Sequence, residues 1–475
     1  MSNYDTSFRD VNWGLLAQTL NVASGILLLP IVLTYLTTEE VGLWFVFTSL
    51  AGLAFLLELG LQPTISRYVA YIYAGVQKLE KVGINDQNEN EKSELNYNLL
   101  ADVYLSTKKI YFVITLFVII VLLGLGTFYI STLLSTDHSV LNIIMAWCLY
   151  SVGFIINFYY GYYVAFLHGR GDITRSNQMI VFNRLLMMVL GCLFLVLGYG
   201  LIGLGLSSLL SGLISRLFLY KVFWDKDRSE INYLKTVKII HDKRTSGVIW
   251  HNSIKLGLVF VGAFLITRMN VLVASSFIGL AAAASYGLTI QVLMMITTMA
   301  SSLYSTKLPG MNFEQIYGNK DKVLESFSLS LAVSWFFYIL MVICLIVAGN
   351  FILNFIGSDV LFLNTVLLAC LALVFLLDMN QSLCASYLTT HNEVSFVPAV
   401  LVSGVFILIV SVILVYFFNM GILGLIISQA CIQLAYNHWK WPTEAAKKLN
   451  TGFLDLLYRG FVNLFIIVFR GSRYG

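Results

Sequence analysis

The sequence predicts an all-α, polytopic membrane protein with about twelve transmembrane helices, in two six-helix repeats of like orientation around a central cavity. With 58% hydrophobic and 11% charged residues among 475 positions, the chain has too little polar surface to cover a soluble globule. Apolar runs such as Ile110–Leu134 and Val394–Phe418 are long enough to cross about 30 Å of hydrocarbon as helices. These runs do not alternate between apolar and polar residues, as the strands of a membrane barrel would.

The individual spans follow from hydropathy and length. The first apolar stretch, Leu15–Leu36, lacks a small-residue cleavage pattern after it, so we expect it to remain as a helix. The stretch Phe453–Arg470 contains Asp455, Arg459 and Asn463, and we expect it to be an interfacial helix on the cytoplasmic face. The predicted spans are residues 11–36, 41–72, 107–133, 140–167, 176–198, 200–222, 249–276, 281–306, 326–352, 360–388, 395–418 and 421–441.

The distribution of basic residues predicts the orientation. None of the 29 Lys and Arg residues falls in the connections near 37–40, 134–140, 198–200, 277–282, 353–361 and 418–421. The other connections, with the helix ends next to them, and the two termini hold all of them except five that lie deeper inside predicted helices. Because basic residues concentrate in cytoplasmic loops, this segregation places both termini in the cytoplasm.

An internal repeat underlies the layout. Gly200-Leu-Ile-Gly-Leu204 matches Gly421-Ile-Leu-Gly-Leu425, and the acidic residues Asp172 and Glu393 at two corresponding helix ends show the same spacing of 221 positions. Each half has an even number of helices, so the halves share one orientation, as in many transporters. We therefore expect a bundle at 1–225, a cytoplasmic linker at 226–248, a second bundle at 249–442 and a tail at 443–475.

Seven ionisable side chains lie within predicted helices. Each costs about 2.5–3.5 kcal/mol at the bilayer centre on insertion scales, so each is expected to have a partner or to face water. The basic ones either snorkel to the headgroups or line a cytoplasm-facing cavity that binds an anionic group such as pyrophosphate or an acidic sugar. They are Arg67, Arg184, Arg216, Lys255 and Arg268.

Glu58 and Asp378 are the two acidic residues of this set. Each either pairs with an intramembrane cation or binds and releases a proton or sodium ion during transport. Asp378, followed by Asn380-Gln381-Ser382, is the stronger coupling candidate. Gly60 and Pro63 follow Glu58 and predict a bend in the second helix, a hinge beside a candidate coupling residue.

Signatures of enzymes are not found. The sequence has no P-loop, nucleophile elbow, dinucleotide fingerprint or metal-spaced His and Cys cluster, so we expect a protein that is not an enzyme and that has no cofactor or bound metal. The six Cys are expected to be packing residues. The histidines, His438 among them, are expected at helix ends or in loops. Nothing in the charge pattern indicates nucleic acid, whereas anionic membrane lipids suit the basic cytoplasmic loops.

Several motifs resemble those of a known family. Glu39-Glu-Val-Gly-Leu-Trp44, Glu58-Leu-Gly-Leu61 and Arg67-Tyr68 are similar to the start of polysaccharide flippases of the multidrug/oligosaccharidyl-lipid/polysaccharide exporter (MOP) superfamily. Arg268-Met-Asn-Val-Leu272 and Ser285-Tyr-Gly287 resemble the corresponding start of the second half there. The chain departs from the family pattern in having Glu58 where an Asp is frequent and Asn270 where many relatives carry an acid.

The resemblance implies a flippase for an O-antigen unit, or for a related unit of lipopolysaccharide or other surface-polysaccharide biosynthesis. Its substrate would be an undecaprenyl-pyrophosphate-linked oligosaccharide, moved across the bacterial inner membrane by alternating access. A polysaccharide polymerase and a chain-length regulator are the protein partners that it suggests.

Three other functions compete with this one. An ion-coupled multidrug or cation antiporter of the same superfamily would favour acids over bases in its cavity, the reverse of the pattern seen here. A lipid II-type flippase would carry two more C-terminal helices. A membrane polymerase or glycosyltransferase would need a large external loop, and all the predicted loops here are short.

Overall fold

The computed structural model describes residues 13, 27–58, 60–78, 95–134, 140–225, 229–236, 243–316, 319–389 and 396–470. Over these residues the chain is helical and contains no strand, and ten helical segments are long and apolar enough to cross a membrane. The predicted fold class of a polytopic helical membrane protein is therefore confirmed. Most of the predicted first span, 11–36, lies outside the described residues.

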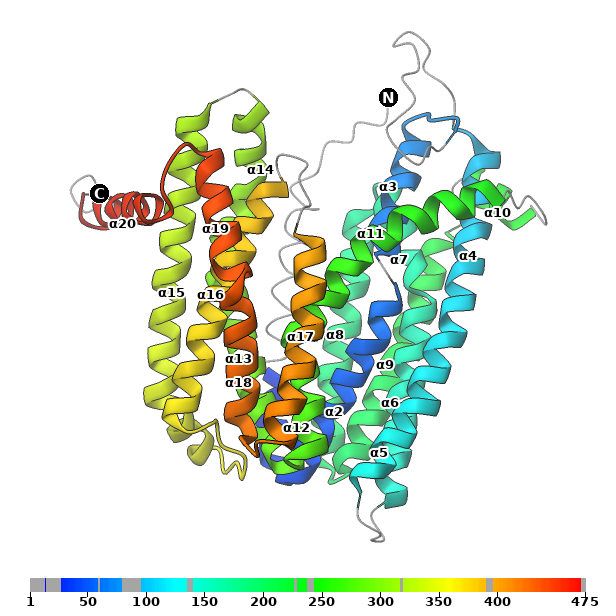
Figure 1. Ribbon diagram of the computed structural model, residues 1–475. Helices are drawn as coiled ribbons and strands as arrows, with labels where there is room; N and C mark the ends of the chain where they lie inside the picture. Colours follow the sequence, from blue (N-terminus) through cyan, green and yellow to red (C-terminus); the bar gives the residue numbers. More distant parts are fainter. Residues whose placement is uncertain are drawn as a thin grey trace. The chain divides into compact units, whose positions relative to one another are not determined.

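Contacts between residues divide the chain into two compact units (Figure 1). Unit 1 comprises Met1–Leu36 with Phe47–Val261, and unit 2 comprises Thr37–Val46 with Gly262–Gly475. The division falls inside two helices, α2 (Thr38–Phe55) and α11 (Lys243–Thr267). The bundle and linker boundaries expected from the repeat stay predictions.

Unit 1 is built from long helices, several of them interrupted. The described helices are the later part of α2, η1 (Leu56–Glu58), α3 (Leu61–Tyr73), α4 (Tyr97–Ile119), η2 (Ile120–Gly126), α5 (Thr127–Leu133), α6 (Val140–Tyr159), α7 (Gly161–Gly169), α8 (Ile173–Val196), α9 (Gly200–Phe223), α10 (Ser229–Thr236) and the larger part of α11.

A π-helical turn, η2, joins α4 to α5 in one continuous span, Tyr97–Leu133. A π-turn frees backbone carbonyls that must find other donors in hydrocarbon. The indole Nε1 of Trp147 on α6 donates to the Leu122 carbonyl oxygen and to Thr127 Oγ1, each at 3.2 Å. Gly126 gives the ring room, since a Cβ there would lie 2.7 Å from Trp147. The irregular turn is thus satisfied by one buried side chain.

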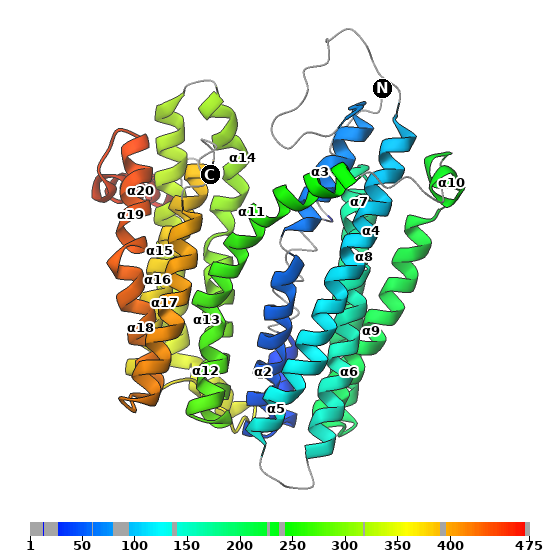
Figure 2. The same ribbon diagram turned by 45° about the vertical axis from the view of Figure 1, so that its right-hand side comes forward.

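Unit 2 contains the start of α2 and the end of α11, followed by a second set of long helices (Figure 2). They are α12 (Met269–Phe277), α13 (Leu280–Ala300), α14 (Ser302–Ile316), α15 (Lys320–Phe355), α16 (Thr365–Thr389), α17 (Val397–Tyr416), α18 (Gly421–Ala435), α19 (Asn437–Lys448) and α20 (Phe453–Arg470). The predicted last span, 421–441, is two helices here, because Tyr436 breaks the helix with φ −144° and ψ −58°.

Helix α20 runs crosswise to the long helices of unit 2 and packs on α15 (Figure 1). Its Gly460 lies against the backbone of Ser328, so close that a Cβ could not fit. Leu456 is buried, whereas Leu454, Tyr458 and Phe465 are exposed. An amphipathic helix with an exposed apolar stripe suits the membrane interface, the position expected from its sequence.

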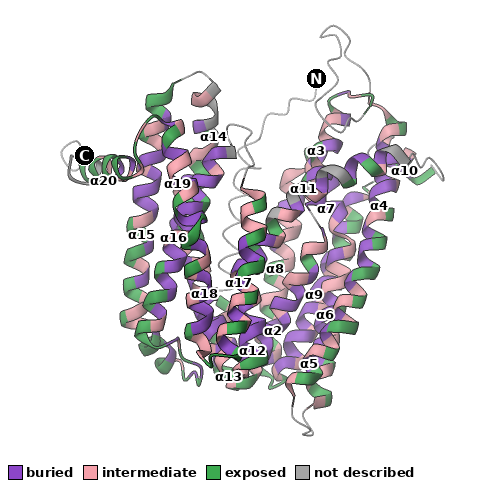
Figure 3. Cartoon of the chain, in the orientation of Figure 1, coloured by how far each residue is buried: buried purple, intermediate pink, exposed green. Residues whose placement is uncertain are grey.

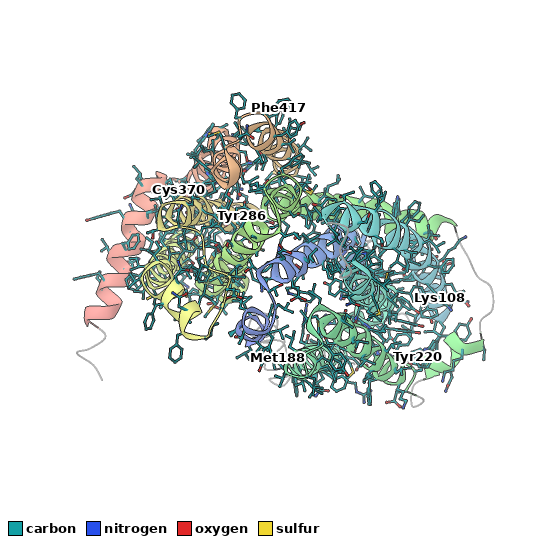
Figure 4. The ribbon with its side chains drawn as sticks, turned by 90° about the horizontal axis from the view of Figure 1, so that it is seen from below. Lys108, Met188, Tyr220, Tyr286, Cys370 and Phe417 are labelled. Atoms are coloured by element: carbon teal, nitrogen blue, oxygen red, sulfur yellow. The ribbon has the colours of Figure 1, made fainter. Side chains whose placement is uncertain are left out.

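Exposed apolar side chains mark the surfaces that suit lipid. Figure 3 shows exposed residues along the long helices of each unit, and on α15 these include Phe351 and Phe355. In unit 2, viewed from below in Figure 4, Phe417 points outward from its helix and Tyr286 lies among the helices. Tyr286 is fully buried and Phe417 is largely exposed. Hydrocarbon can cover such apolar faces at no cost, which water could not.

Close packing of α6 on α9 depends on glycine. A Cβ at Gly153 would lie 2.5 Å from the backbone of Ser208. We predict that Gly153→Ala destabilises the protein by about 1–3 kcal/mol, because backbone has to move to make room. Thermal unfolding in detergent measures this effect. Gly310→Ala on α14 is the control, since its Cβ would meet nothing within 4 Å. Equal unfolding temperatures for the two variants would contradict the packing argument.

Candidate substrate and ion sites

A cavity of ≈ 520 Å³ lies within unit 1. It is formed by the later part of α2, η1 and α3 together with α6, α7, α8 and α9. Two Arg residues and one Glu line it, and we call it the guanidinium cavity. The polar residues of its wall are Thr48, Glu58, Gln62, Tyr150, Asn157, Asn183, Arg184, Ser208, Ser215 and Arg216.

Arg216 on α9 is held by neutral side chains. Its Nε donates to Asn157 Oδ1 at 3.0 Å, and Asn157 Nδ2 donates to the Gly153 carbonyl oxygen at 3.1 Å. Ser215 Oγ donates to Asn183 Oδ1 at 3.0 Å beside it. Among the described residues the two terminal amino groups of Arg216 have no hydrogen-bond acceptor. The guanidinium is therefore fixed in position while its planar fork of donors remains available to a ligand.

Arg184 on α8 lines the same cavity with an exposed side chain. Arg184 and Arg216 come from neighbouring helices, since α8 packs along α9. Their combined charge favours an anion in this partly enclosed space, where screening by water is weaker than in bulk solution.

Glu58 is the acidic residue of the cavity. It is buried, and its carboxylate accepts a hydrogen bond of 2.6 Å from Tyr111 Oη on α4. Glu58 and Arg216 also attract each other electrostatically. Next to Glu58, Gly60 adopts a left-handed conformation with φ 68° and caps α3, and Pro63 fits in the first turn of that helix. A break between η1 and α3 thus occurs at Gly60, and a hinge at Gly60 and Pro63 stays a prediction.

Arg67 and Arg268 are not among the residues that line this cavity. Arg67 is exposed on α3 and lines a neighbouring pocket of ≈ 410 Å³, which has Gln62 in common with the guanidinium cavity. Arg268 caps α12 in unit 2, at the break between α11 and α12, and is half-buried. Lys255 lies on α11, and its side chain is outside the described part of the chain. Of the four predicted cations whose side chains are described, the structure therefore brings together Arg184 and Arg216.

Asp378 on α16 is the centre of a second polar site, in unit 2. Gln429 Nε2 donates to its Oδ2 at 2.9 Å, and Gln433 Nε2 donates to its Oδ1 at 3.0 Å. His438 Nε2 lies 2.8 Å from the same Oδ1. We call these four residues the Asp378 cluster.

His438 lies at a helix end, as expected, because it is the second residue of α19, but sequence analysis did not predict that its ring is buried against Asp378. The helix break at Tyr436 and the continuation as α19 bring the ring to this position. A sequence signal existed: Gln429, Gln433 and Asn437 are spaced four residues apart, which puts three amides on one helix face. Such a polar face in a membrane span must meet a polar partner.

Asn270, the position where an acid was expected from the resemblance, is fully buried on α12. It accepts a 2.9 Å hydrogen bond from Ser411 Oγ on α17. The residue is thus part of the helix packing of unit 2.

The sequence comparisons found no matching protein-family model and no match among the curated proteins. The fold of the chain is shared with solved transporters. An inward-facing multidrug resistance MATE family transporter of the MOP superfamily has a TM-score of 0.70 at 15% identity, over 91% of this chain and 95% of that one. An outward-facing one has a TM-score of 0.54 at 16% identity, over 93% and 95%.

A third solved structure is a MOP superfamily transporter from Pyrococcus furiosus, described by the reverse polarity of its binding pocket. It has a TM-score of 0.51 at 16% identity, over 92% of this chain and 93% of that one. Taken together, the fold defines a multi-pass membrane protein. More particularly, it is the fold of MATE-type transporters of the MOP superfamily, and identities this low show the fold alone.

The Glu58–Tyr111 bond generates a stability prediction. Tyr111→Phe removes the donor from a buried carboxylate, so we expect a loss of about 1–3 kcal/mol. Thermal unfolding of the purified protein measures it, and Glu58→Met, which has no oxygen to accept the bond, completes a double-mutant cycle with Tyr111→Phe. The two changes should be strongly non-additive, since each removes the same bond. Strict additivity would show that the bond does not stabilise the protein.

Proposed function

We propose that this protein is a flippase that moves an undecaprenyl-pyrophosphate-linked oligosaccharide from the cytoplasmic to the periplasmic leaflet by alternating access. The observation that carries the proposal is the guanidinium cavity, which is lined by Arg184 and Arg216 and by one carboxylate, Glu58. That carboxylate already accepts a hydrogen bond from Tyr111. Arg forks suit the oxygens of a pyrophosphate, which binds two donors at once.

The remaining wall of the cavity fits a glycan next to the phosphates. Gln62 and Asn183 supply amide groups that can bond sugar hydroxyls, while Tyr150 and Phe154 supply rings. A volume of ≈ 520 Å³ holds a headgroup rather than a whole polyprenyl lipid, whose chain would stay in the membrane.

Energetics agree with this direction of movement. Moving net negative charge out of a negative interior gains about 2.3 kcal/mol per charge per 100 mV. A proton or sodium gradient would add to this, with Glu58 and Asp378 as the coupling candidates. The proposal places the protein in the bacterial inner membrane, with cytoplasmic termini, beside a polysaccharide polymerase and chain-length regulator as functional partners.

A multidrug antiporter is the second candidate, favoured by the fold shared with MATE transporters and by the presence of Glu58 in the cavity. A cationic drug would gain from Glu58 but be repelled by two guanidinium groups. The lipid II-type flippase would use the same cavity chemistry, so substrate identity decides between it and the oligosaccharide flippase. A polymerase or glycosyltransferase is the alternative from another class.

The guanidinium groups supply the first test. Arg184→Ala and Arg216→Ala should each lower export about tenfold or more, since one charged hydrogen bond contributes about 1.5–3 kcal/mol. The measurement is periplasmic exposure of the glycan in a host that lacks this gene and makes the lipid-linked oligosaccharide. Protein amounts are matched by immunoblot.

Arg175→Ala is the matched control, because Arg175 is exposed and its 3.3 Å ion pair with Asp225 lies outside the cavity. It should export normally. Normal export by both cavity variants would remove the guanidinium groups from the substrate site. Normal periplasmic glycan without the protein, together with drug efflux that requires it, would favour the antiporter.

A further inference from the structure

Both carboxylate oxygens of Asp378 accept hydrogen bonds from N–H donors. Gln429 occupies Oδ2, and Gln433 and His438 share Oδ1, at 2.8–3.0 Å. The donors come from α18 and α19, and Asp378 itself is largely buried, with 17% of its side chain exposed. The carboxylate is thus held by three donors inside unit 2.

The orientation of one donor is fixed by chemistry. Side-chain amide oxygen and nitrogen are normally hard to tell apart, and the hydrogen-bond network must decide. Trp441 Nε1 can only donate, and it lies 3.0 Å from Asn437 Oδ1. Asn437 Nδ2 therefore faces Gln433 Oε1 at 2.7 Å, and this turns Gln433 Nε2 toward Asp378.

The hydrogen bonds that run from Trp441 through Asn437 and Gln433 to Asp378 disfavour the binding of a metal cation at Asp378. Hard cations such as sodium take oxygen ligands, and here the carboxylate is faced by N–H hydrogens with positive partial charge. If the Gln433 amide were flipped so that its oxygen faced a cation at Asp378, its nitrogen would face the Asn437 nitrogen. Two buried N–H donors would then lie against each other with no acceptor between them. Leaving such buried groups unsatisfied costs free energy.

A proton has a place in the same cluster. An ionised carboxylate accepts only, so a neutral His438 donates from Nε2 and leaves Nδ1 without a proton. In the described part of the chain, His438 Nδ1 is buried and has no hydrogen-bond partner. Adding one proton there changes the net charge of the pair from −1 to zero while its bond to Asp378 stays in place. The proton then belongs to the pair rather than to either residue.

We propose that Asp378 and His438 form a proton site that excludes sodium, so that the coupling ion of this transporter is a proton. The proton comes from water at one membrane face and returns to water at the other, and no bond between heavy atoms changes. Its use in transport rests on the proposed function, whereas its binding does not.

Other ionisable groups of the helices packed nearby have to be considered. Tyr338 on α15 interacts electrostatically with Asp378, and its hydroxyl donates to the Ala372 carbonyl oxygen at 2.8 Å. On α19, Lys440 and Glu444 pair with each other at 3.0 Å. The remaining such groups on α13, α16, α18 and α20 include Tyr286, Cys370, Cys384, Tyr387, Cys431, Asp455 and Arg459. Tyrosine and cysteine ordinarily titrate above the histidine range.

The test uses the purified full-length protein without any glycolipid. Trp441 and Trp335, which donates to Asn380 Oδ1 at 3.1 Å, report on this region by intrinsic fluorescence. The wild type should show a pH-dependent transition in emission, because the Asp378–His438 pair gains a proton. His438→Gln, which keeps a donor for Asp378, should lose that transition. His168→Gln, at a buried ring nitrogen in unit 1, should retain it.

The second part of the test measures whether sodium changes the unfolding temperature. At constant pH, replacing choline chloride with sodium chloride should leave the unfolding temperature of the wild type unchanged, because a bound ligand would raise it. Trp441→Phe removes the donor that orients Asn437, and should make the unfolding temperature sensitive to sodium. The sodium measurement tests whether the site excludes sodium even if His438→Gln does not fold.

Two results would overturn the proposal: a sodium-dependent rise in the unfolding temperature of the wild type, or a pH transition that persists in His438→Gln. Either would leave the flippase proposal standing, since neither readout involves a substrate. Conversely, a proton-binding protein that moves no glycolipid would overturn the function and keep the site.

Discussion

The structure depends on one constraint: within hydrocarbon, every polar group and charge must find its partner inside the protein. Glu58 is held by Tyr111, and Asp378 is held by three N–H donors. The same constraint explains why Trp147 donates to the carbonyl oxygen at the π-helical turn. These two carboxylates and the π-helical turn are thus each matched by specific side chains on other helices, which helps to fix where the two polar sites lie.

The two sites differ in their chemistry, and the difference suggests a division of tasks. In unit 1, guanidinium groups with donors still available line a cavity of ≈ 520 Å³ and suit an anionic ligand. In unit 2, a carboxylate is enclosed by donors already oriented toward it. On this account, unit 1 binds the substrate headgroup and unit 2 carries the proton, and each can be tested without the other.

Much of the fold could be predicted from sequence, because span length and hydropathy follow from the thickness of the bilayer. The sites were harder to predict. Arg67, Arg184 and Arg216 look alike in sequence, and only the pairing of α8 with α9 puts two of them in one cavity. The contact of His438 with Asp378 was missed because residues 421–441 have the hydropathy of one span, whereas a single break at Tyr436 starts a new helix. The depth of a residue in the membrane cannot be counted from the end of its predicted span when that span is interrupted.

The central claim is that the guanidinium cavity carries the pyrophosphate-linked headgroup across the membrane. The most direct measurement is reconstitution of the purified protein in liposomes that contain labelled undecaprenyl-pyrophosphate-linked oligosaccharide, with the glycan in each leaflet detected by an impermeant lectin or enzyme. The account predicts protein-dependent movement between leaflets that inorganic pyrophosphate inhibits and that the Arg184→Ala, Arg216→Ala double variant lacks. Movement at the same rate in the double variant would contradict it.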